Sequence, residues 1–278
     1  MKKEVLIKNI KAGAGNPLVF IGGPCVIENE KMLFSTAAEI KKITEELDIP
    51  FILKSSYKKA NRTSVNSFTG IGDRAALDIL RSAAEKYDVP CLTDIHTIEE
   101  AQMAAEYTDV LQIPAFLSRQ TELLVAAGET GKVINIKKGQ FMAPEDIGHA
   151  VRKVESTGNE RIMVTERGVS FGYHNLVVDM KGLVVMGKFG YPVVMDATHA
   201  VQIPSKGDKS EGQPEFIPAL ARAAVATGID VLFMEVHPDP ANAMSDAASQ
   251  YPLPKLRNFL SGIKELDALV KKLNLTEV

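Results

Sequence analysis

Short apolar runs recur along the whole chain and alternate with longer amphipathic stretches. Runs of this kind are typical of strands that are buried on both faces, as in a parallel sheet. The eight runs that we interpret as strands are Leu18 to Gly22, Phe51 to Leu53, Cys91 to Thr93, Val110 to Ile113, Val133 to Ile136, Arg161 to Thr165, Pro192 to Met195 and Val231 to Met234. Strands that alternate with helices predict an α/β protein.

The stretches between these runs carry apolar residues at the spacing of a helix with one buried face. We expect helices at Glu30 to Leu47, Asp73 to Tyr87, Glu99 to Glu106, Gln120 to Thr130, Pro144 to Ser156 and Glu215 to Thr227. Thr97 and Pro144 each precede a pair of acidic residues, which is a helix-start signal. The alternation is even and no Pro/Gly/Ser-rich linker interrupts it, so we expect residues 1–278 to form a single (β/α)8 TIM barrel domain.

Two segments depart from a bare barrel. Residues Val5 to Ile10 form an alternating run and Ala12 to Asn16 supply a glycine-rich turn, which together predict a short N-terminal β-hairpin that closes the bottom of the barrel. The polar stretch from Pro204 to Pro214 follows the seventh strand and contains two glycines. Its composition and position are those of a lid over an active site.

Composition narrows the classes of function. Hydrophobic residues make up 45% of the chain and charged residues 24%, which is typical of a globular protein, and no apolar stretch is long enough to span a membrane. The first residues, MKKEVLIKNI, lack the apolar core of a signal peptide, so we expect a cytoplasmic protein. The net charge of -3 gives no general reason to bind nucleic acid or an acidic membrane. Cys25 and Cys91 belong to opposite strand ends, so we expect no disulfide between them.

Polar residues that can bind an anion, a metal or a proton follow nearly every predicted strand. In a (β/α)8 barrel the C-terminal ends of the strands converge on one mouth, which holds the active site. The residues at or just past the strand ends are Cys25, Lys54, Asp94, Arg119, Lys137, Arg167, His199 and Glu235. The pattern therefore predicts one composite site.

Cations and neutral donors dominate one part of this site. The segment KSSYKKANRTS, residues 54 to 64, contains Lys54, Lys58, Lys59 and Arg62 with the uncharged donors Ser55, Ser56, Asn61, Thr63 and Ser64, and later strands add Lys137, Lys138, Gln140 and Arg167. Such a run can also be a solvated basic loop. However, cationic strand ends that face one another repel unless an anion joins them, which favours a phosphorylated ligand.

A second group has the residue types of a metal site: Cys25, His199, Glu235 and Asp246. A thiolate, an imidazole and carboxylates suit zinc, iron, manganese or cobalt better than magnesium. A lone cysteine or histidine is often structural, and His237 competes with His199 as a ligand. Asp94 could orient a hydroxylated substrate or cap the next helix, and Arg119 could bind phosphate or contact another subunit.

Several motifs in order carry a family resemblance. KANR, IPAFLSRQT, KKGQF, TERG, DATHAVQ and MEVHPDP, within a stretch from GGPCVIEN at residue 22 to SDAASQ at residue 250, resemble 3-deoxy-D-manno-octulosonate 8-phosphate synthase (KDO 8-phosphate synthase). That family condenses phosphoenolpyruvate with D-arabinose 5-phosphate and water and releases phosphate. The resemblance implies a (β/α)8 barrel, usually a homotetramer, whose product feeds lipopolysaccharide synthesis.

The resemblance also implies roles for individual residues. Phosphoenolpyruvate is assigned to Lys54, Lys59, Lys137, Gln140 and Arg167. Arabinose 5-phosphate is assigned to Asn61, Arg62, Thr63 and Asp94, with Arg119 reaching its phosphate from a neighbouring subunit. The implied catalytic set is Lys54, Lys59, Asn61, Asp94 and His199. Cys25 and SDAASQ are similar to the metal-dependent branch, whose ligands would be Cys25, His199, Glu235 and Asp246, which favours His199 over His237.

The sequence departs from the family at a few positions. Thr63 stands where serine is common, and Glu211 and Pro214 stand in the lid where glycine and arginine are common. The nearest rival is 3-deoxy-D-arabino-heptulosonate 7-phosphate synthase, which uses erythrose 4-phosphate and usually has KPRT where this chain has KANRTS. The residues are also compatible with a Schiff-base aldolase that uses Lys137 or Lys138 as the nucleophile, or with a phosphosugar-binding barrel without catalysis.

Overall fold

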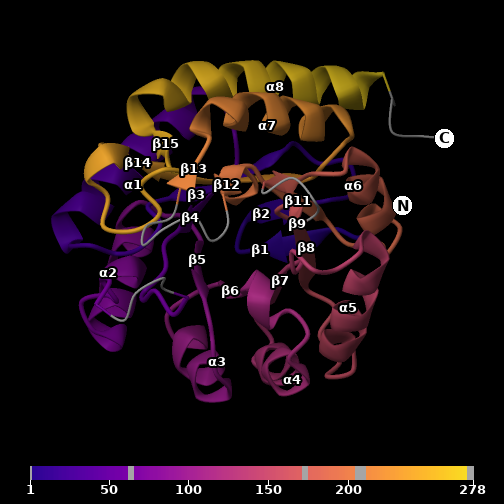
Figure 1. Cartoon of the computed structure of the whole chain (residues 1–278), viewed down its shortest axis with the longest axis horizontal. Helices are drawn as coiled ribbons and strands as arrows, with labels where there is room; N and C mark the ends of the chain where they lie inside the picture. Colours follow the sequence, from indigo (N-terminus) through magenta and orange to yellow (C-terminus); the bar gives the residue numbers. More distant parts are fainter. Residues whose placement is uncertain (1, 62–65, 171–174, 204–210, 274–278) are drawn as a thin grey trace.

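Eight parallel strands close into a barrel in the computed structural model, which describes residues 2–61, 66–170, 175–203 and 211–273 (Figure 1). The strands are β3 (Val19–Gly23), β4 (Phe51–Lys54), β5 (Cys91–Asp94), β6 (Val110–Ile113), β7 (Val133–Lys137), β8 (Ile162–Glu166), β11 (Val193–Asp196) and β14 (Val231–His237). The barrel closes because β14 pairs in parallel with both β3 and β11. The predicted fold is confirmed.

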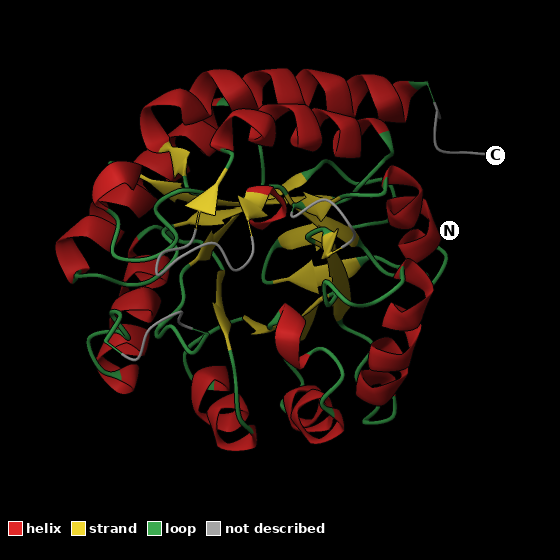
Figure 2. Ribbon diagram, viewed as in Figure 1, coloured by secondary structure: helices red, strands yellow, loops and turns green. Residues whose placement is uncertain are grey.

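Helices surround the barrel on the outside, as Figure 2 shows. They are α1 (Glu30–Glu46), α2 (Asp73–Lys86), α3 (Ile98–Ala105), α4 (Thr121–Glu129), α5 (Ile147–Glu155), α6 (Met180–Gly187), α7 (Ile217–Ala226) and α8 (Leu256–Lys272). Pro144 begins a 3₁₀ turn that leads into α5, and Thr97 caps α3 by accepting a hydrogen bond from the Glu100 backbone at 3.3 Å. Among the helices of the described ranges, none has the length and apolar character of a membrane span.

A hairpin closes the bottom of the barrel, as predicted. Its strands, β1 (Val5–Ile7) and β2 (Ile10–Ala12), bury Val5, Ile7, Ile10 and Ala12 against the inward-facing residues of the barrel. The turn lies earlier than the glycine-rich segment predicts, because Ile7 pairs with Ile10 and the chain therefore reverses within the run from Val5 to Ile10. Lys8 adopts a φ of 49° in this turn. Such a φ is usually found at glycine, and because no glycine marks this position, the sequence pattern does not indicate the reversal.

The segment that we interpret as a lid is described only in part. Residues 204–210 lie outside the described residues, whereas β12 (Gln202–Ile203) and β13 (Glu211–Gly212) pair in an antiparallel fashion on either side of them. Pro214 begins a 3₁₀ turn that leads into α7. Three further short strands, β9 (Val169–Ser170), β10 (Leu176–Val177) and β15 (Tyr251–Pro252), were not predicted, since two residues carry no readable pattern.

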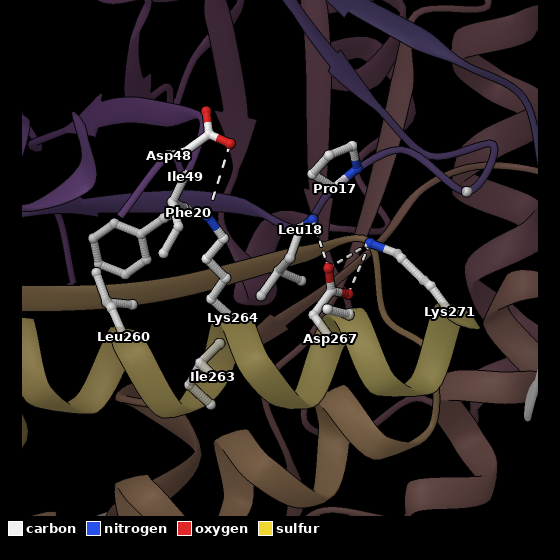
Figure 3. A pocket seen from close by; sticks show the side chains of 12 residues that line it. Pro17, Leu18, Phe20, Asp48, Ile49, Leu260, Ile263, Lys264, Asp267 and Lys271 are labelled. Carbon is white, nitrogen blue, oxygen red and sulfur yellow. Dashed lines mark hydrogen bonds and ion pairs between the residues drawn. The ribbon is translucent and has the colours of Figure 1, made fainter. Parts of the chain in front are cut away.

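A largely apolar pocket lies between α8 and the residues that lead into β3 and β4 (Figure 3). Asp267 of α8 accepts a hydrogen bond from the Leu18 backbone at 3.1 Å and forms an ion pair with Lys271. Because Leu18 precedes β3, these contacts attach α8 at the N-terminal end of the strands. The pocket is therefore at the opposite end of the barrel from the predicted active site.

Candidate active site

Three of the four expected metal ligands lie together at the mouth. Ligand atoms of Cys25, Glu235 and Asp246 all lie within 4.8 Å of one another. Cys25 follows β3 and Glu235 lies in β14, where it pairs with Gly23, so the parallel register of two adjacent strands brings them together. Asp246 comes from the loop after β14, and its carboxylate lies 3.2 Å from the Cys25 sulfur.

His199 lies beside this cluster, with one ring nitrogen turned toward it. It begins the 3₁₀ turn that follows β11, and its Nε2 is 3.5 Å from Glu235 Oε1, whereas its Nδ1 is 2.8 Å from Asp196 Oδ2. A carboxylate on one imidazole nitrogen commonly orients the other nitrogen toward a metal. Glu235 Oε2 is buried and has no hydrogen-bond partner among the described residues, so it is open to a further ligand.

His237 is oriented differently. Its Nδ1 accepts a hydrogen bond from the Asp239 backbone at 3.0 Å, and its Nε2 lies 3.4 Å from Glu28. The same Glu28 accepts a hydrogen bond from the backbone of Met244, near Asp246 in the loop after β14. Nδ1 of His237 is therefore occupied, whereas its buried Nε2 has no hydrogen-bond partner among the described residues and lies beside Glu28. His199 is favoured as the ligand because its Nε2 lies beside Glu235 of the cluster.

Two lysines neutralise the acidic cluster. Lys54 Nζ lies 2.6 Å from Glu235 Oε1, and Lys59 Nζ lies 2.8 Å from Asp246 Oδ2 and 3.2 Å from the Cys25 sulfur. Burial alone would lower the pKa of each lysine, but Glu235 and Asp246 outweigh it and raise the pKa of Lys54 and Lys59. Burial and Glu235 raise the pKa of the Cys25 thiol, so metal binding there would release a proton.

Asp196 connects His199, which lies beside the cluster, with Lys137 of β7. This carboxylate is fully buried at the end of β11, 2.5 Å from Lys137 Nζ and 2.8 Å from His199 Nδ1. Burial opposes its charge, but His199 and Lys137 hold the pKa of Asp196 well below its ordinary value. Sequence reasoning assigned it no role, although an acidic residue that ends a buried strand is the same signal that identified Asp94.

Arg167 and Gln140 present unsatisfied groups at the mouth. Arg167 Nη2 donates to Gln202 Oε1 at 2.7 Å, whereas its buried Nη1 and the buried Gln140 Oε1 have no partner among the described residues. A buried guanidinium nitrogen without a partner is the kind of group that a phosphate or carboxylate oxygen satisfies. Burial lowers the pKa of Arg167, against the attraction of Asp196.

Lys137, the last residue of β7, and Lys138, which follows it, have different contacts. Lys137 points to Asp196, whereas Lys138 is buried with its Nζ 3.2 Å from the Met142 carbonyl and 3.4 Å from Glu166. Successive residues of a strand point to opposite faces, which accounts for the divergence. Lys138 therefore does not join the cations of the mouth.

Asp94 is the central described residue of the predicted site for the sugar phosphate. Its Oδ2 accepts a hydrogen bond from Ser56 and its Oδ1 one from Gln112, each at 2.7 Å. Asp94 does not cap the following helix, since Thr97 does. Asn61 is exposed in the loop after β4, whereas Arg62, Thr63 and Ser64 lie outside the described residues.

Lys58 holds the base of that loop instead of facing the cluster. Its Nζ contacts Glu100 and lies 3.3 Å from Asp73, and Glu100 also accepts a hydrogen bond from the His96 backbone at 2.8 Å. Burial would raise the pKa of Glu100, but hydrogen bonds from His96 and Lys58 lower it below its ordinary value. Glu100 thus anchors the residue next to Lys59.

Replacing Glu100 with glutamine tests this anchor. Since the folded-state pKa lies below the unfolded value of about 4.3, the stability that the carboxylate contributes is complete above about pH 5 and is lost as the pH falls through the folded-state pKa. We expect Glu100→Gln to lower the free energy of unfolding by about 1–3 kcal/mol at neutral pH, and the difference to narrow below about pH 4. Urea unfolding at several pH values measures this, with the exposed Glu106→Gln as the control. A difference that stays constant with pH would contradict it.

Arg119 is exposed on the rim. It lies in a pocket with Phe141, Asp146 and His149, where the loops after β6 and β7 meet α5. Phe116 and Phe141 are each 58% exposed in the same loops. Aromatic residues are enriched in protein–protein interfaces, so this face is a candidate contact surface for another subunit.

Comparison with known proteins gives the family. The model of the DAHP synthetase I family matches residues 2–272. Three curated relatives named 2-dehydro-3-deoxyphosphooctonate aldolase align over nearly the whole chain. The protein of Trichlorobacter lovleyi is 54% identical over 272 residues, which is 98% of this chain and 100% of the relative. The protein of Geobacter metallireducens is 53% identical, and the alignment covers 98% of this chain and 100% of the relative. The protein of Francisella tularensis subsp. holarctica is 52% identical, and the alignment covers 98% of this chain and 99% of the relative. This chain therefore belongs to the DAHP synthetase I family.

Proposed function

We propose that this enzyme condenses phosphoenolpyruvate with D-arabinose 5-phosphate and water to give 3-deoxy-D-manno-octulosonate 8-phosphate and phosphate. The observation that carries the proposal is the identity of 52–54%, over nearly the full chain, to relatives named 2-dehydro-3-deoxyphosphooctonate aldolase. The site supports it, because the buried cations Lys54, Lys137 and Arg167 converge on one mouth with an unsatisfied guanidinium nitrogen. Two anionic substrates need such a set of cations.

The substrates divide the mouth between them. Phosphoenolpyruvate binds to Lys54, Lys59, Lys137, Gln140 and Arg167. The sugar phosphate binds to Asn61, Arg62, Thr63 and Asp94, with Arg119 contributed by a neighbouring subunit. Asp94 is held at both oxygens, as a carboxylate that orients sugar hydroxyls needs to be.

We further propose that Cys25, His199, Glu235 and Asp246 hold a divalent ion, with zinc, iron, manganese or cobalt as candidates. The clustered thiol and carboxylates, the His199 imidazole held by Asp196 and the buried unpartnered Glu235 Oε2 fit that group. When bound, an ion of this kind would supply Lewis-acid chemistry, either to polarise the aldehyde or to lower the pKa of the attacking water.

The chain's own residues act mainly by charge and position. The enol carbon of phosphoenolpyruvate attacks the sugar aldehyde, and water captures the cationic C2 before phosphate leaves with cleavage of its carbon–oxygen bond. Lys54, Lys137 and Arg167 hold the enol phosphate beside a second phosphorylated molecule, which offsets strong repulsion and fixes the approach. Asp196 keeps Lys137 and His199 in place while the charges develop.

Assembly and compartment complete the proposal. The enzyme forms a homotetramer in which Arg119 enters a neighbouring site, a contact that the exposed Phe116 and Phe141 support. Its residues 1–278 form one domain. It works in the cytoplasm, where its free thiols Cys25 and Cys91 stay reduced, and its product supplies lipopolysaccharide synthesis.

The test is phosphate release from phosphoenolpyruvate, with arabinose 5-phosphate and erythrose 4-phosphate compared as acceptors. Enzyme stripped with a chelator is measured before and after a divalent metal is restored. We expect release with arabinose 5-phosphate only after metal is added. Equal activity without metal would support the proposed synthase reaction but contradict the proposed need for a metal ion. A preference for erythrose 4-phosphate would replace the substrate, and no release with either acceptor would overturn the proposed reaction.

A further inference from the structure

Four polar side chains form a continuous line across adjacent strands inside the barrel. Thr165 of β8 donates to Asn135 of β7 at 2.6 Å, and Asn135 donates to Gln112 of β6 at 2.9 Å. Gln112 in turn donates to Asp94 of β5 at 2.7 Å. The line therefore runs across half of the barrel and ends at the carboxylate that we assign to the sugar phosphate.

The direction of these hydrogen bonds is fixed by the groups themselves. The Thr165 hydroxyl donates to Asn135 Oδ1, so the amide nitrogen of Asn135 faces Gln112 Oε1. The amide nitrogen of Gln112 then faces Asp94, which as a carboxylate can only accept. Turning over either amide would set oxygen against oxygen in a buried place. Thr165, Asn135 and Gln112 are at most 2% exposed, so water does not compensate for a wrong orientation.

Burying these polar side chains costs free energy that an apolar barrel interior would not cost. One layer further down, the barrel interior is apolar, with Val110, Val133 and Met163 on the same three strands. Buried amides destabilise a fold unless their polar groups are paired, and in this line the pairing leads from strand to strand to Asp94 at the mouth. Ser56 holds Asp94 from the other side at 2.7 Å.

We propose that Gln112 is a positioning residue that sets selectivity for the acceptor substrate, a polyol phosphate whose hydroxyl groups Asp94 orients. Asn135 and Thr165 hold Gln112 in the single orientation that donates to Asp94. The inference rests on the proposed function, because it takes Asp94 as a contact of the sugar phosphate. It predicts that changes along the line act on the sugar phosphate and leave phosphoenolpyruvate, bound by other residues, almost unaffected.

Gln112→Glu is the informative variant. In its protonated form the introduced carboxyl group can accept from Asn135 and donate to Asp94, as glutamine does, whereas the ionised form repels Asp94. The facing carboxylate and burial favour the protonated form. The positive charges of Lys54 and Lys137, which lower the pKa of Asp94, favour the ionised form of the introduced carboxyl group and act against the protonated form. The KM for arabinose 5-phosphate should therefore stay near that of the parent at about pH 6 and rise by roughly tenfold toward about pH 9.

Gln112→Leu separates positioning from a general structural role. It should raise the same KM by roughly tenfold at every pH, because it cannot donate in any protonation state. The KM for phosphoenolpyruvate should change less than about twofold in both variants. Met163→Leu, which alters the barrel interior one layer lower, is the control and should change neither constant. If Gln112→Leu fails to fold, the nearly isosteric Thr165→Val should raise the sugar KM about threefold by freeing the Asn135 amide.

The outcomes separate this inference from the function on which it rests. Calorimetric titration of arabinose 5-phosphate into the parent enzyme and each variant accompanies the kinetics. If the parent neither binds nor turns over arabinose 5-phosphate, the proposed function falls and the inference falls with it. If the parent behaves as proposed, two results overturn the role of Gln112 alone. One is an equal rise in both KM values, and the other is a Gln112→Glu variant whose sugar KM follows the pH dependence of the parent.

Discussion

Arg167→Ala is expected to lower kcat by roughly 10²-fold or more, as the loss of one preorganised charge contact commonly does. Arg167 is 5% exposed, and its Nη2 is held by Gln202 at 2.7 Å, so the guanidinium is fixed before a ligand arrives. Its buried Nη1 has no partner in the described part of the chain, which leaves that donor for an anion. Steady-state phosphate release with both substrates at saturation measures the effect.

Arg161→Ala is the matched control for this variant. Arg161 directly precedes β8, whereas Arg167 directly follows it. Arg161 is exposed, and its guanidinium donates to the Gly131 and Leu6 carbonyls at the bottom of the barrel. It should leave turnover nearly unchanged. Arg167→Lys keeps the charge but loses the planar donor pair, so it should recover only part of the activity. A near-normal rate for Arg167→Ala would remove Arg167 from the phosphoenolpyruvate site.

The strands of the barrel were readable from the sequence for a physical reason. A strand that is buried on both faces is largely apolar, and all eight predicted runs coincide closely with strands of the barrel. Helices with one apolar stripe were also readable. The α6 segment, GLVVMG within Met180–Gly187, is apolar all round and so resembles a strand as much as a helix. The long helix α8 carries a clear stripe that includes Leu256, Leu260 and Ile263, and it was simply missed.

The sequence predicts which residue types gather at the mouth of the barrel, but it does not predict their individual contacts. The rule that strand ends meet at the mouth brought Cys25 and Glu235 together, and the parallel register of β3 and β14 accounts for it. The separation of Lys58 from Lys59 depends on side-chain direction, since one contacts Glu100 and the other Asp246. A sequence pattern carries no such information for a loop.

The hydrogen-bonded line to Asp94 was beyond sequence reasoning for a different reason. Asp94, Gln112 and Asn135 are neighbours only because the registers of β5, β6 and β7 place them opposite one another. A shift of one residue would turn each side chain to the other face of its strand. Register emerges from the closure of the whole barrel, so no local pattern could indicate which polar residues meet.

Cys25→Ser is expected to lower the affinity for a divalent metal by roughly 10²-fold or more and to lower metal-dependent turnover with it. A hydroxyl can keep the hydrogen bond to Asp246 that the thiol makes at 3.2 Å, so the fold around the site should remain. What is lost is the thiolate, the donor that binds zinc and iron more strongly than an alcohol does. Metal content after dialysis against a chelator, together with competition titration, measures the affinity apart from activity.

Cys91→Ser is the control, because it removes the other thiol at the far end of the barrel. Cys91 is buried at the start of β5, and burial raises the pKa of its thiol to about 12, so it is an inert structural group. Its loss should leave metal content unchanged and affect at most stability. If Cys25→Ser retained as much metal as Cys91→Ser, Cys25 would be no ligand. The contacts of Lys59 with Cys25 and Asp246 would then be a buried ion-pair network that shapes the substrate site.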